Sequence, residues 1–220
     1  SYAKLRKQGN NEQVTFCIPS GNFGDMMGCV LAYKMGLPIK KILIASNSNN
    51  EFEVLLTTKK YAKIEPSKNC LSSAMNVGHP SNLARLIELY DGNMDEQGNM
   101  HKNPDFAALQ NDFYAMSVSD ELTKQTIKKA WLDYNVLLEP HGAVGWACVE
   151  KYLLETGNNS EELLISLETA HPAKFPESII ENIGIDPELP VSLQGIEEKE
   201  EQFDSIQGNY QAFKKYLLAK

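Results

Sequence analysis

The chain has 220 residues, of which 42% are hydrophobic and 23% charged, a composition typical of a globular protein with a sizeable core. This composition excludes a chain that is disordered throughout, and no apolar run approaches the roughly 18 residues of a membrane span. The net charge of −8, from 21 basic and 29 acidic residues, argues against a nucleic-acid-binding protein, because such proteins carry a basic face.

The first part of the chain predicts a βαβ unit. An apolar run over 14–19 predicts a buried strand, 26–35 predicts a helix, and 41–46 predicts a second strand. Gly36 and Pro38 follow the helix and are typical of a helix end. Two strands joined by one helix over about thirty residues indicate parallel pairing with a right-handed crossover.

The pattern weakens after a polar loop at 46–50, and resumes as alternating helices and strands. Helices are predicted at 79–90, 122–134 (capped by Ser119), 143–154 and 176–183, strands at 136–138 and 162–167, and an exposed loop at 91–103. The fold class expected from this alternation is α/β, with a mostly parallel sheet flanked by helices.

We predict three parts along the chain. Residues 1–13 are interpreted as the end of a preceding helix and a polar loop, which suggests a piece of a longer chain. Residues 14–185 form the α/β domain portion, and residues 186–220 form a linker rich in Pro and Glu followed by a helical segment over 203–218.

The four cysteines lie at 17, 29, 70 and 148, with no CxxC pair and no histidine at a metal-ligand spacing. We therefore expect free thiols in a reducing cytoplasm rather than disulfides, and no metal site.

One motif lies at the joint between the first strand and the first helix. Backbone N–H groups at a helix start lack partners, and the helix dipole favours an anion there. The motif is not a P-loop, because no lysine follows, and it lacks the GxGxxG spacing of dinucleotide-binding folds. Phosphate binding and a tight, well-capped turn are both open readings of its residues, which are Ser20, Gly21, Asn22, Phe23, Gly24 and Asp25.

A second motif, Glu168-Thr-Ala-His-Pro-Ala-Lys-Phe175, follows the strand predicted at 162–167. Ligands of α/β sheets bind outside the carboxyl ends of the strands. Thr169 offers a hydroxyl that can donate or accept a hydrogen bond, and His171 and Lys174 could bind an anion or transfer protons there. The alternative is a loop whose histidine caps a neighbour and whose lysine is solvated.

Two further motifs are rich in small or polar residues. Glu139-Pro-His-Gly-Ala143 joins a strand to a helix, and residues 72–82 are dense in hydroxyl and amide groups, with Arg85 one turn further. Each could face a ligand, and each is also explained by the start of a helix.

These motifs together, in this order, resemble threonine synthase, a pyridoxal 5′-phosphate (PLP) enzyme of fold type II, the tryptophan synthase β-like fold. The resemblance rests on Ile18-Pro-Ser-Gly-Asn-Phe-Gly-Asp25, Met35-Gly-Leu-Pro-Ile-Lys40, Leu71-Ser-Ser-Ala-Met75, Gly78-His-Pro-Ser-Asn82, Glu139-Pro-His-Gly-Ala143 and Thr169-Ala-His-Pro-Ala-Lys-Phe175. It covers residues 14–190 and corresponds to the second half of such an enzyme.

The resemblance implies that this part of an enzyme takes O-phospho-L-homoserine and water to L-threonine and phosphate. It implies that Ser20–Gly24 hold the cofactor phosphate and that Thr169 faces the pyridine nitrogen. Contacts with the substrate are expected, by polarity and position, from Asn82, Arg85, His171 and Lys174.

The lysine that forms the Schiff base in this family precedes the Gly-Asn-Phe-Gly loop, and nothing in this sequence matches its motif. The expected partners are therefore the missing N-terminal half and the substrate, with oligomerisation possible and no nucleic acid or membrane. Two alternatives remain: another fold type II lyase, such as a threonine dehydratase, or a non-catalytic module that binds a phosphate ligand or a protein.

Overall fold

The computed structural model describes residues 13–157, 163–196 and 198–219. Most of the predicted 1–13 segment thus lies outside the described residues. The chain divides into two compact units, residues 1–187 and residues 188–220, and each is described by itself. Among the described residues, no helix is long and apolar enough to traverse a lipid bilayer.

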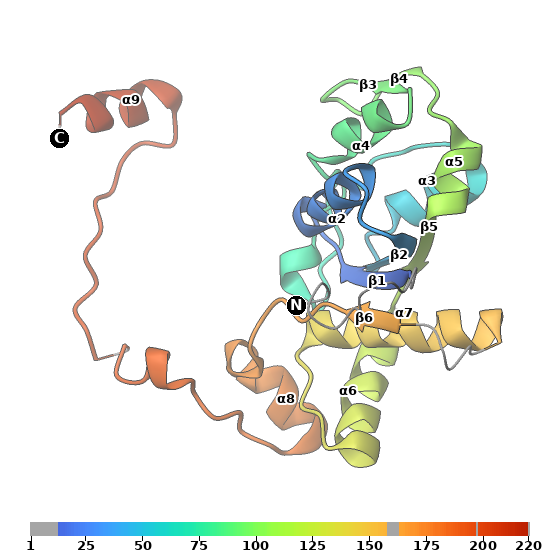
Figure 1. Ribbon diagram of the computed structural model, residues 1–220. Coiled ribbons are helices and arrows are strands. Elements are labelled where there is room, and N and C mark those ends of the chain that lie inside the picture. The colour runs from blue at the N-terminus through green and yellow to red at the C-terminus, as the bar shows by residue number, and fades with distance from the viewer. Residues whose placement is uncertain (1–12, 158–162, 197, 220) are drawn as a thin grey trace. The chain divides into compact units, whose positions relative to one another are not determined.

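The unit before residue 188 contains an α/β fold (Figure 1). Its elements in chain order are β1 (Val14–Pro19), α2 (Gly24–Lys34), β2 (Ile39–Ser46), α3 (Glu51–Thr58), the 3₁₀ turn η1 (Ser73–Met75), α4 (Leu83–Leu89), β3 (Asn93–Met94), β4 (Met100–Lys102), α5 (Phe106–Asp112), β5 (Phe113–Ser117), α6 (Asp120–Tyr134), α7 (Pro140–Thr156), β6 (Leu163–Ser166), the 3₁₀ turn η2 (Pro172–Lys174) and α8 (Pro176–Ile183).

Four of the strands form one parallel sheet in the order β5-β2-β1-β6. β1 lies between β2 and β6, so the carboxyl ends of β1 and β6 lie side by side at one edge of the sheet. A two-stranded antiparallel hairpin, β3 with β4, stands apart from this sheet. The expected α/β class with a mostly parallel sheet is confirmed.

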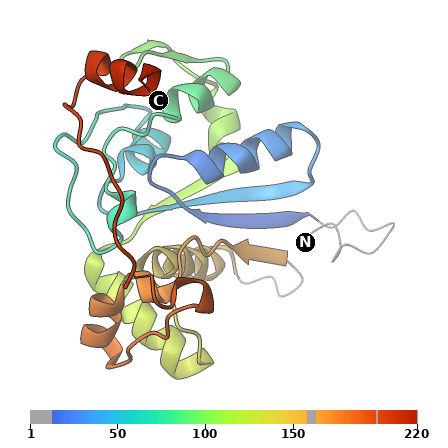
Figure 2. The same ribbon diagram turned by 90° about the vertical axis from the view of Figure 1, so that its left-hand side faces the viewer.

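Both faces of the sheet are buried, which explains the nearly continuous apolar runs of its central strands. Ile42 and Ile44 of β2 join the core under α2, α3, α4 and α5, whereas Leu43 and Ala45 face α7. The alternation follows from the period of two along a strand. Figure 2 shows the sheet between these two layers, with α2 on one side and α7 on the other.

Helix ends mostly follow the predicted signals. Ser119 accepts a hydrogen bond from the Leu122 amide at the start of α6, and α8 begins at Pro176 and ends before Gly184, as predicted. The strand predicted at 136–138 is wrong. The segment joins α6 directly to α7, and Leu138 packs with Ile127 and Ala130 of α6, so it pairs with no strand among the residues that the structure describes.

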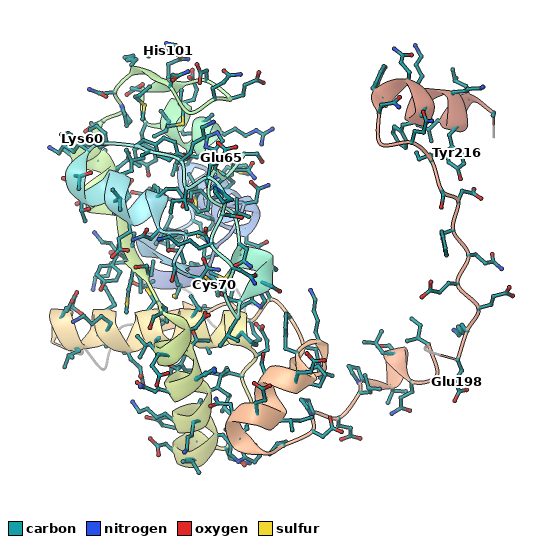
Figure 3. The ribbon with its side chains drawn as sticks, turned by 180° about the vertical axis from the view of Figure 1, so that it is seen from behind. Lys60, Glu65, Cys70, His101, Glu198 and Tyr216 are labelled. Carbon is teal, nitrogen blue, oxygen red and sulfur yellow. The ribbon has the colours of Figure 1, made fainter. Side chains whose placement is uncertain are left out.

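Two helices and a strand, α3, α5 and β5, were not predicted, and the loop expected at 91–103 carries the β3–β4 hairpin. In the unit after residue 187 the structure describes a 3₁₀ turn, η3 (Val191–Leu193), and α9 (Tyr210–Leu218), which begins later than the predicted 203. Figure 3 shows the side chains of this unit, including Glu198 in the turn after η3 and Tyr216 on α9.

Candidate functional site

A cleft of about 280 Å³ opens where β1 gives way to α2. It is lined by Pro19, Ser20, Gly21, Asn22, Phe23, Gly24, Asp25, Ala74, Met75, His141 and Thr169. These residues come from four separate stretches: the β1–α2 loop, the turn η1, the start of α7 and the segment after β6. The cleft therefore lies at the carboxyl edge of the sheet, beside two adjacent strands, where α/β folds bind ligands.

The start of α2 presents backbone donors to the cleft. The first hydrogen bond of the helix runs from the Met27 amide to the Phe23 carbonyl, so the N–H groups of Gly24, Asp25 and Met26 precede it. The N-cap residue Phe23 provides no side-chain cap. Free N–H groups and the positive end of the helix dipole together favour an anion at this point.

Phe23 sits in the left-handed region, with φ of 63° and ψ of 23°. Such a conformation costs a non-glycine residue about 1–2 kcal/mol. The Phe23 side chain is only 2% exposed and meets the Phe52 ring edge-on at 5.4 Å, and burial of a Phe side chain stabilises by roughly 1.5–3 kcal/mol. The aromatic contact thus offsets the strain and holds the turn that aims the α2 amides into the cleft.

The other loop residues are fixed by hydrogen bonds. The backbone N–H of Ser20 donates to Ala45, and its hydroxyl donates to the Ile18 carbonyl at 3.0 Å. The Asn22 side chain accepts a bond from the Ser81 amide at 2.5 Å, and the Asn22 carbonyl accepts one from the Asn82 side chain at 2.7 Å. These contacts rigidify the loop before any ligand enters, which reduces the entropy cost of binding.

The structure brings Ser20–Gly24 together with Thr169, although about 145 residues separate them in the sequence. The entropic cost of closing a loop rises with its length. Asn82 and Arg85 do not line the cleft. Asn82 holds the loop through Asn22, and Arg85 donates to the Asn82 oxygen at 2.6 Å.

His171 and Lys174 lie outside the residues that line the cleft, and both are exposed. His171 caps η2 by accepting a bond from the Ala173 amide, and the Lys174 amine lies 5.5 Å from the centre of the Phe175 ring.

His141 lines the cleft. Its motif was predicted either to face a ligand or to form an ordinary helix start, and no role was given to His141 itself. Its side chain is buried and its Nδ1 lies 2.5 Å from the Glu139 carboxylate. The sequence feature that could have indicated its position is Pro140, which begins a helix and so places residues 139–142 at a helix start. Which ligand edge that helix start would face depends on long-range packing, which residue spacing does not reveal.

Known proteins similar to this chain in both sequence and structure belong to one family. A family model described as "Threonine synthase, C-terminal" matches residues 142–217. Threonine synthase of Pseudomonas aeruginosa is 31% identical over 216 residues, covering 91% of this chain and 45% of the relative. Threonine synthase of Saccharomyces cerevisiae is 33% identical over 204 residues, covering 81% of this chain and 40% of the relative. The chain thus spans less than half the length of these relatives.

The crystal structure of PLP-bound threonine synthase from Brucella melitensis superposes with a TM-score of 0.81 and 25% identity, over 98% of this chain and 48% of that one. A tomato threonine deaminase, at a TM-score of 0.52 and 16% identity, shares the fold alone. Sequence and fold agree on one family, and the chain belongs with the threonine synthases as a counterpart of their C-terminal half.

Proposed function

We propose that this chain supplies the cofactor-phosphate wall of the active site of a threonine synthase. The whole enzyme takes O-phospho-L-homoserine and water to L-threonine and phosphate with PLP as cofactor. The observation that carries the proposal is the meeting, in one cleft, of the Ser20–Gly24 loop, with its uncapped helix start, and Thr169.

The cleft fits the phosphate group of PLP. A Cβ built on Gly24 meets no atom within 4 Å, so there is open space beside the first residue of α2. Asp25, exposed in the first turn of α2, opposes an anion there. Three backbone donors and the helix dipole act on a phosphate at closer range than this solvated carboxylate does.

Thr169 would hold the other end of the cofactor. Its hydroxyl can donate to or accept from a ring nitrogen without carrying charge, so the ring would not be held firmly protonated. When bound, PLP acts as the electron sink for the reaction, and the protein binds and orients it. The chemistry requires proton removal at Cα and then at Cβ of the substrate, loss of the γ-phosphate, and addition of water at Cβ.

Asn82 and Arg85 act, in our proposal, through the loop that Asn22 belongs to, and His171 and Lys174 border the substrate entrance beside η2. We also propose that residues 14–185 are the cofactor-binding portion, that 186–220 are a linker and helical segment, and that the protein is cytoplasmic.

The Schiff-base lysine would come from the N-terminal half of the enzyme, which makes that half the required partner. The test begins with ³¹P NMR of PLP titrated into the chain, with pyridoxal, which lacks the phosphate, as the matched ligand control. We expect a shifted phosphate signal with PLP and no saturable binding of pyridoxal. Absence of saturable PLP binding would contradict the phosphate-wall proposal.

Borohydride reduction followed by peptide mapping separates a half-site from a complete one. We expect no single labelled lysine in the chain alone, whereas one specific adduct would overturn the division between two halves. With the N-terminal half of a threonine synthase added, phosphate release from O-phosphohomoserine is the expected activity. Ammonia release from threonine would favour the dehydratase reading, and PLP binding without turnover would favour a non-catalytic module.

A further inference from the structure

A fully buried carboxylate organises the start of α7. The Glu139 side chain is 0% exposed and accepts hydrogen bonds from the amides of His141 and Gly142, at 2.8 and 2.7 Å, and from His141 Nδ1 at 2.5 Å. A charged carboxylate in this position caps the helix and favours its dipole. It also fixes the orientation of the imidazole, which lies at the wall of the cleft.

The second ring nitrogen of His141 determines its tautomer. The Ala74 amide donates to Nε2 at 3.1 Å, so Nε2 carries a lone pair and no proton. The proton therefore resides on Nδ1, which donates to Glu139. In this form the neutral imidazole connects a buried carboxylate on α7 to the backbone of η1, 67 residues earlier.

Ala74 in turn helps to support the phosphate loop, which is the loop formed by Ser20–Gly24. A Cβ built on Gly21 would lie 2.9 Å from the Ala74 carbonyl oxygen and 2.9 Å from Met75 Cα, so the loop and η1 pack backbone against backbone. A shift of Ala74 therefore moves the surface on which the loop rests. The chain of contacts runs from Glu139 through His141 and Ala74 to Gly21.

A second carboxyl group, Glu168 on the exposed segment after β6, completes the cluster. Glu168 packs its carboxyl against the start of α7: a Cβ built on Gly142 would lie 2.0 Å from Glu168 Oε2. Burial, and then the nearby charge of Glu139, raise the pKa of Glu168 to about 7. A protonated Glu168 can donate to Glu139, and Glu168 directly precedes Thr169 in the chain.

We propose that Glu139, His141 and Glu168 form a positioning cluster that sets both walls of the cleft: the phosphate loop through Ala74, and Thr169 through Glu168. The identity of the ligand, PLP, rests on the proposed function, whereas the contacts of the cluster are all within this chain. All three are positioning residues. The feature that distinguishes the cluster from simple packing is its dependence on one tautomer and on a donor at position 168.

The first test needs no ligand. In the ¹⁵N-histidine-labelled chain, long-range ¹H–¹⁵N spectra should show one imidazole with a proton on Nδ1 and a bare Nε2, assigned to His141 by its loss in His141→Phe. Glu139→Gln should abolish this pattern and shift the Ala74 amide signal, because a side-chain amide has one acceptor oxygen in place of two. A wild-type His141 with its proton on Nε2 overturns the proposal.

The second test compares three variants for PLP affinity and for the Thr169 amide signal. Glu168→Gln keeps a donor toward Glu139 and should bind PLP within about twofold of the wild type, whereas Glu168→Ala should bind about 3- to 10-fold more weakly. Glu177→Gln, on the exposed face of α8, is the matched control and should change neither readout.

The outcomes separate the cluster from the proposed function. If Glu168→Ala matches the wild type in affinity and in the Thr169 signal, or if Glu168→Gln is as poor as Glu168→Ala, the cluster has no positioning role. If the wild type shows no PLP binding while the tautomer and the amide shifts behave as expected, the cluster stands and the proposed cofactor fails.

Discussion

Gly21 lies where the Ser20–Gly24 loop packs closely against η1. Its missing Cβ leaves room for the backbone of η1, and a side chain there would meet backbone atoms, which cannot rotate away. Gly21→Ala should therefore lower the free energy of unfolding by about 1–3 kcal/mol, as overpacking does, and weaken PLP binding. Thermal denaturation and a PLP titration measure the two effects.

At Gly28, a few residues further along, we expect substitution by alanine to raise the free energy of unfolding instead of lowering it. It lies inside α2, and a Cβ there meets nothing within 4 Å. Gly28→Ala should stabilise the chain by about 0.5–1 kcal/mol, since alanine is the better helix former. A Gly21→Ala variant as stable as Gly28→Ala would show that η1 does not support the loop.

Glu51 is a buried carboxyl group outside the cleft. It is 3% exposed, and its Oε2 has no hydrogen-bond partner in the part of the chain that the structure describes. Burial raises the pKa of Glu51 to about 7, against a weaker lowering by its own amide and by Lys68. Because the folded state holds this proton more tightly than the unfolded state does, the stability from Glu51 is full below pH 4.5 and is lost between pH 4.5 and 7.

Glu51→Gln should remove that loss. Each pKa unit corresponds to about 1.4 kcal/mol, so the variant should gain about 3 kcal/mol over the wild type at pH 7.5 and little at pH 4. Urea denaturation at several pH values gives the difference curve, with Glu88→Gln, exposed on α4, as the control. A difference that stays constant with pH would contradict the assignment.

At the scale of elements, α4 positions the phosphate loop by one side-chain amide. Asn82 Nδ2 donates to the Asn22 carbonyl, and Arg85 donates to the other end of the same amide. Asn82→Asp keeps the oxygen that Arg85 binds and removes the donor. It should weaken PLP binding by roughly 3- to 10-fold, because about 1 kcal/mol of support for the loop is lost.

This variant also distinguishes two roles for Asn82. If Asn82 contacts the substrate instead, Asn82→Asp leaves PLP affinity unchanged and lowers the apparent affinity for O-phosphohomoserine in the reconstituted enzyme. Binding of PLP is measured in the chain alone and the KM in the complete enzyme, so one role cannot be mistaken for the other.

The elements that sequence predicted are those with strong local signals. The βαβ unit, the Ser119 cap of α6 and the Pro176 start of α8 all have residues that favour one structure locally. Helix α3 was missed because Thr57, Thr58 and Val54 weaken its helix propensity. It is held instead by burial of Phe52, Leu55 and Leu56 in the core, which is a tertiary effect.

In the candidate site too, local sequence patterns predicted some residues, whereas others are brought together only by tertiary packing. The loop at 20–24 was predictable because a strand, glycines and a helix start are adjacent in sequence. His141 and Ala74 meet only after α7 crosses the sheet face opposite α2, so local patterns carry no sign of their hydrogen bond. His171 was predicted from its polarity, although its Nδ1 accepts the Ala173 amide in capping η2.

At the scale of the whole chain, two stretches that lack regular structure differ in how they are held. The loop after α3 is tied down by a bond from the Ile64 amide to the Gly78 carbonyl and by one from the Lys68 amide to Asn49. Residues 200–207 are extended and exposed, within the unit that follows Pro187. Glu65 on the tied loop and Glu198 on the linker side are both visible in Figure 3.

A lysine-specific protease should therefore cut after Lys199 before it cuts after Lys68, although both side chains are exposed. Proteolysis requires a backbone that can leave its place, and exposure alone does not provide this. Time-resolved intact-mass measurement gives the order of cleavage. The thermal midpoint of the α/β unit should stay unchanged after the first cut, because the cores that the described residues form include none after 187. Earlier cleavage after Lys68 would show that these hydrogen bonds do not hold the loop, and a lower midpoint after the cut at Lys199 would show that the α/β unit depends on residues after 187.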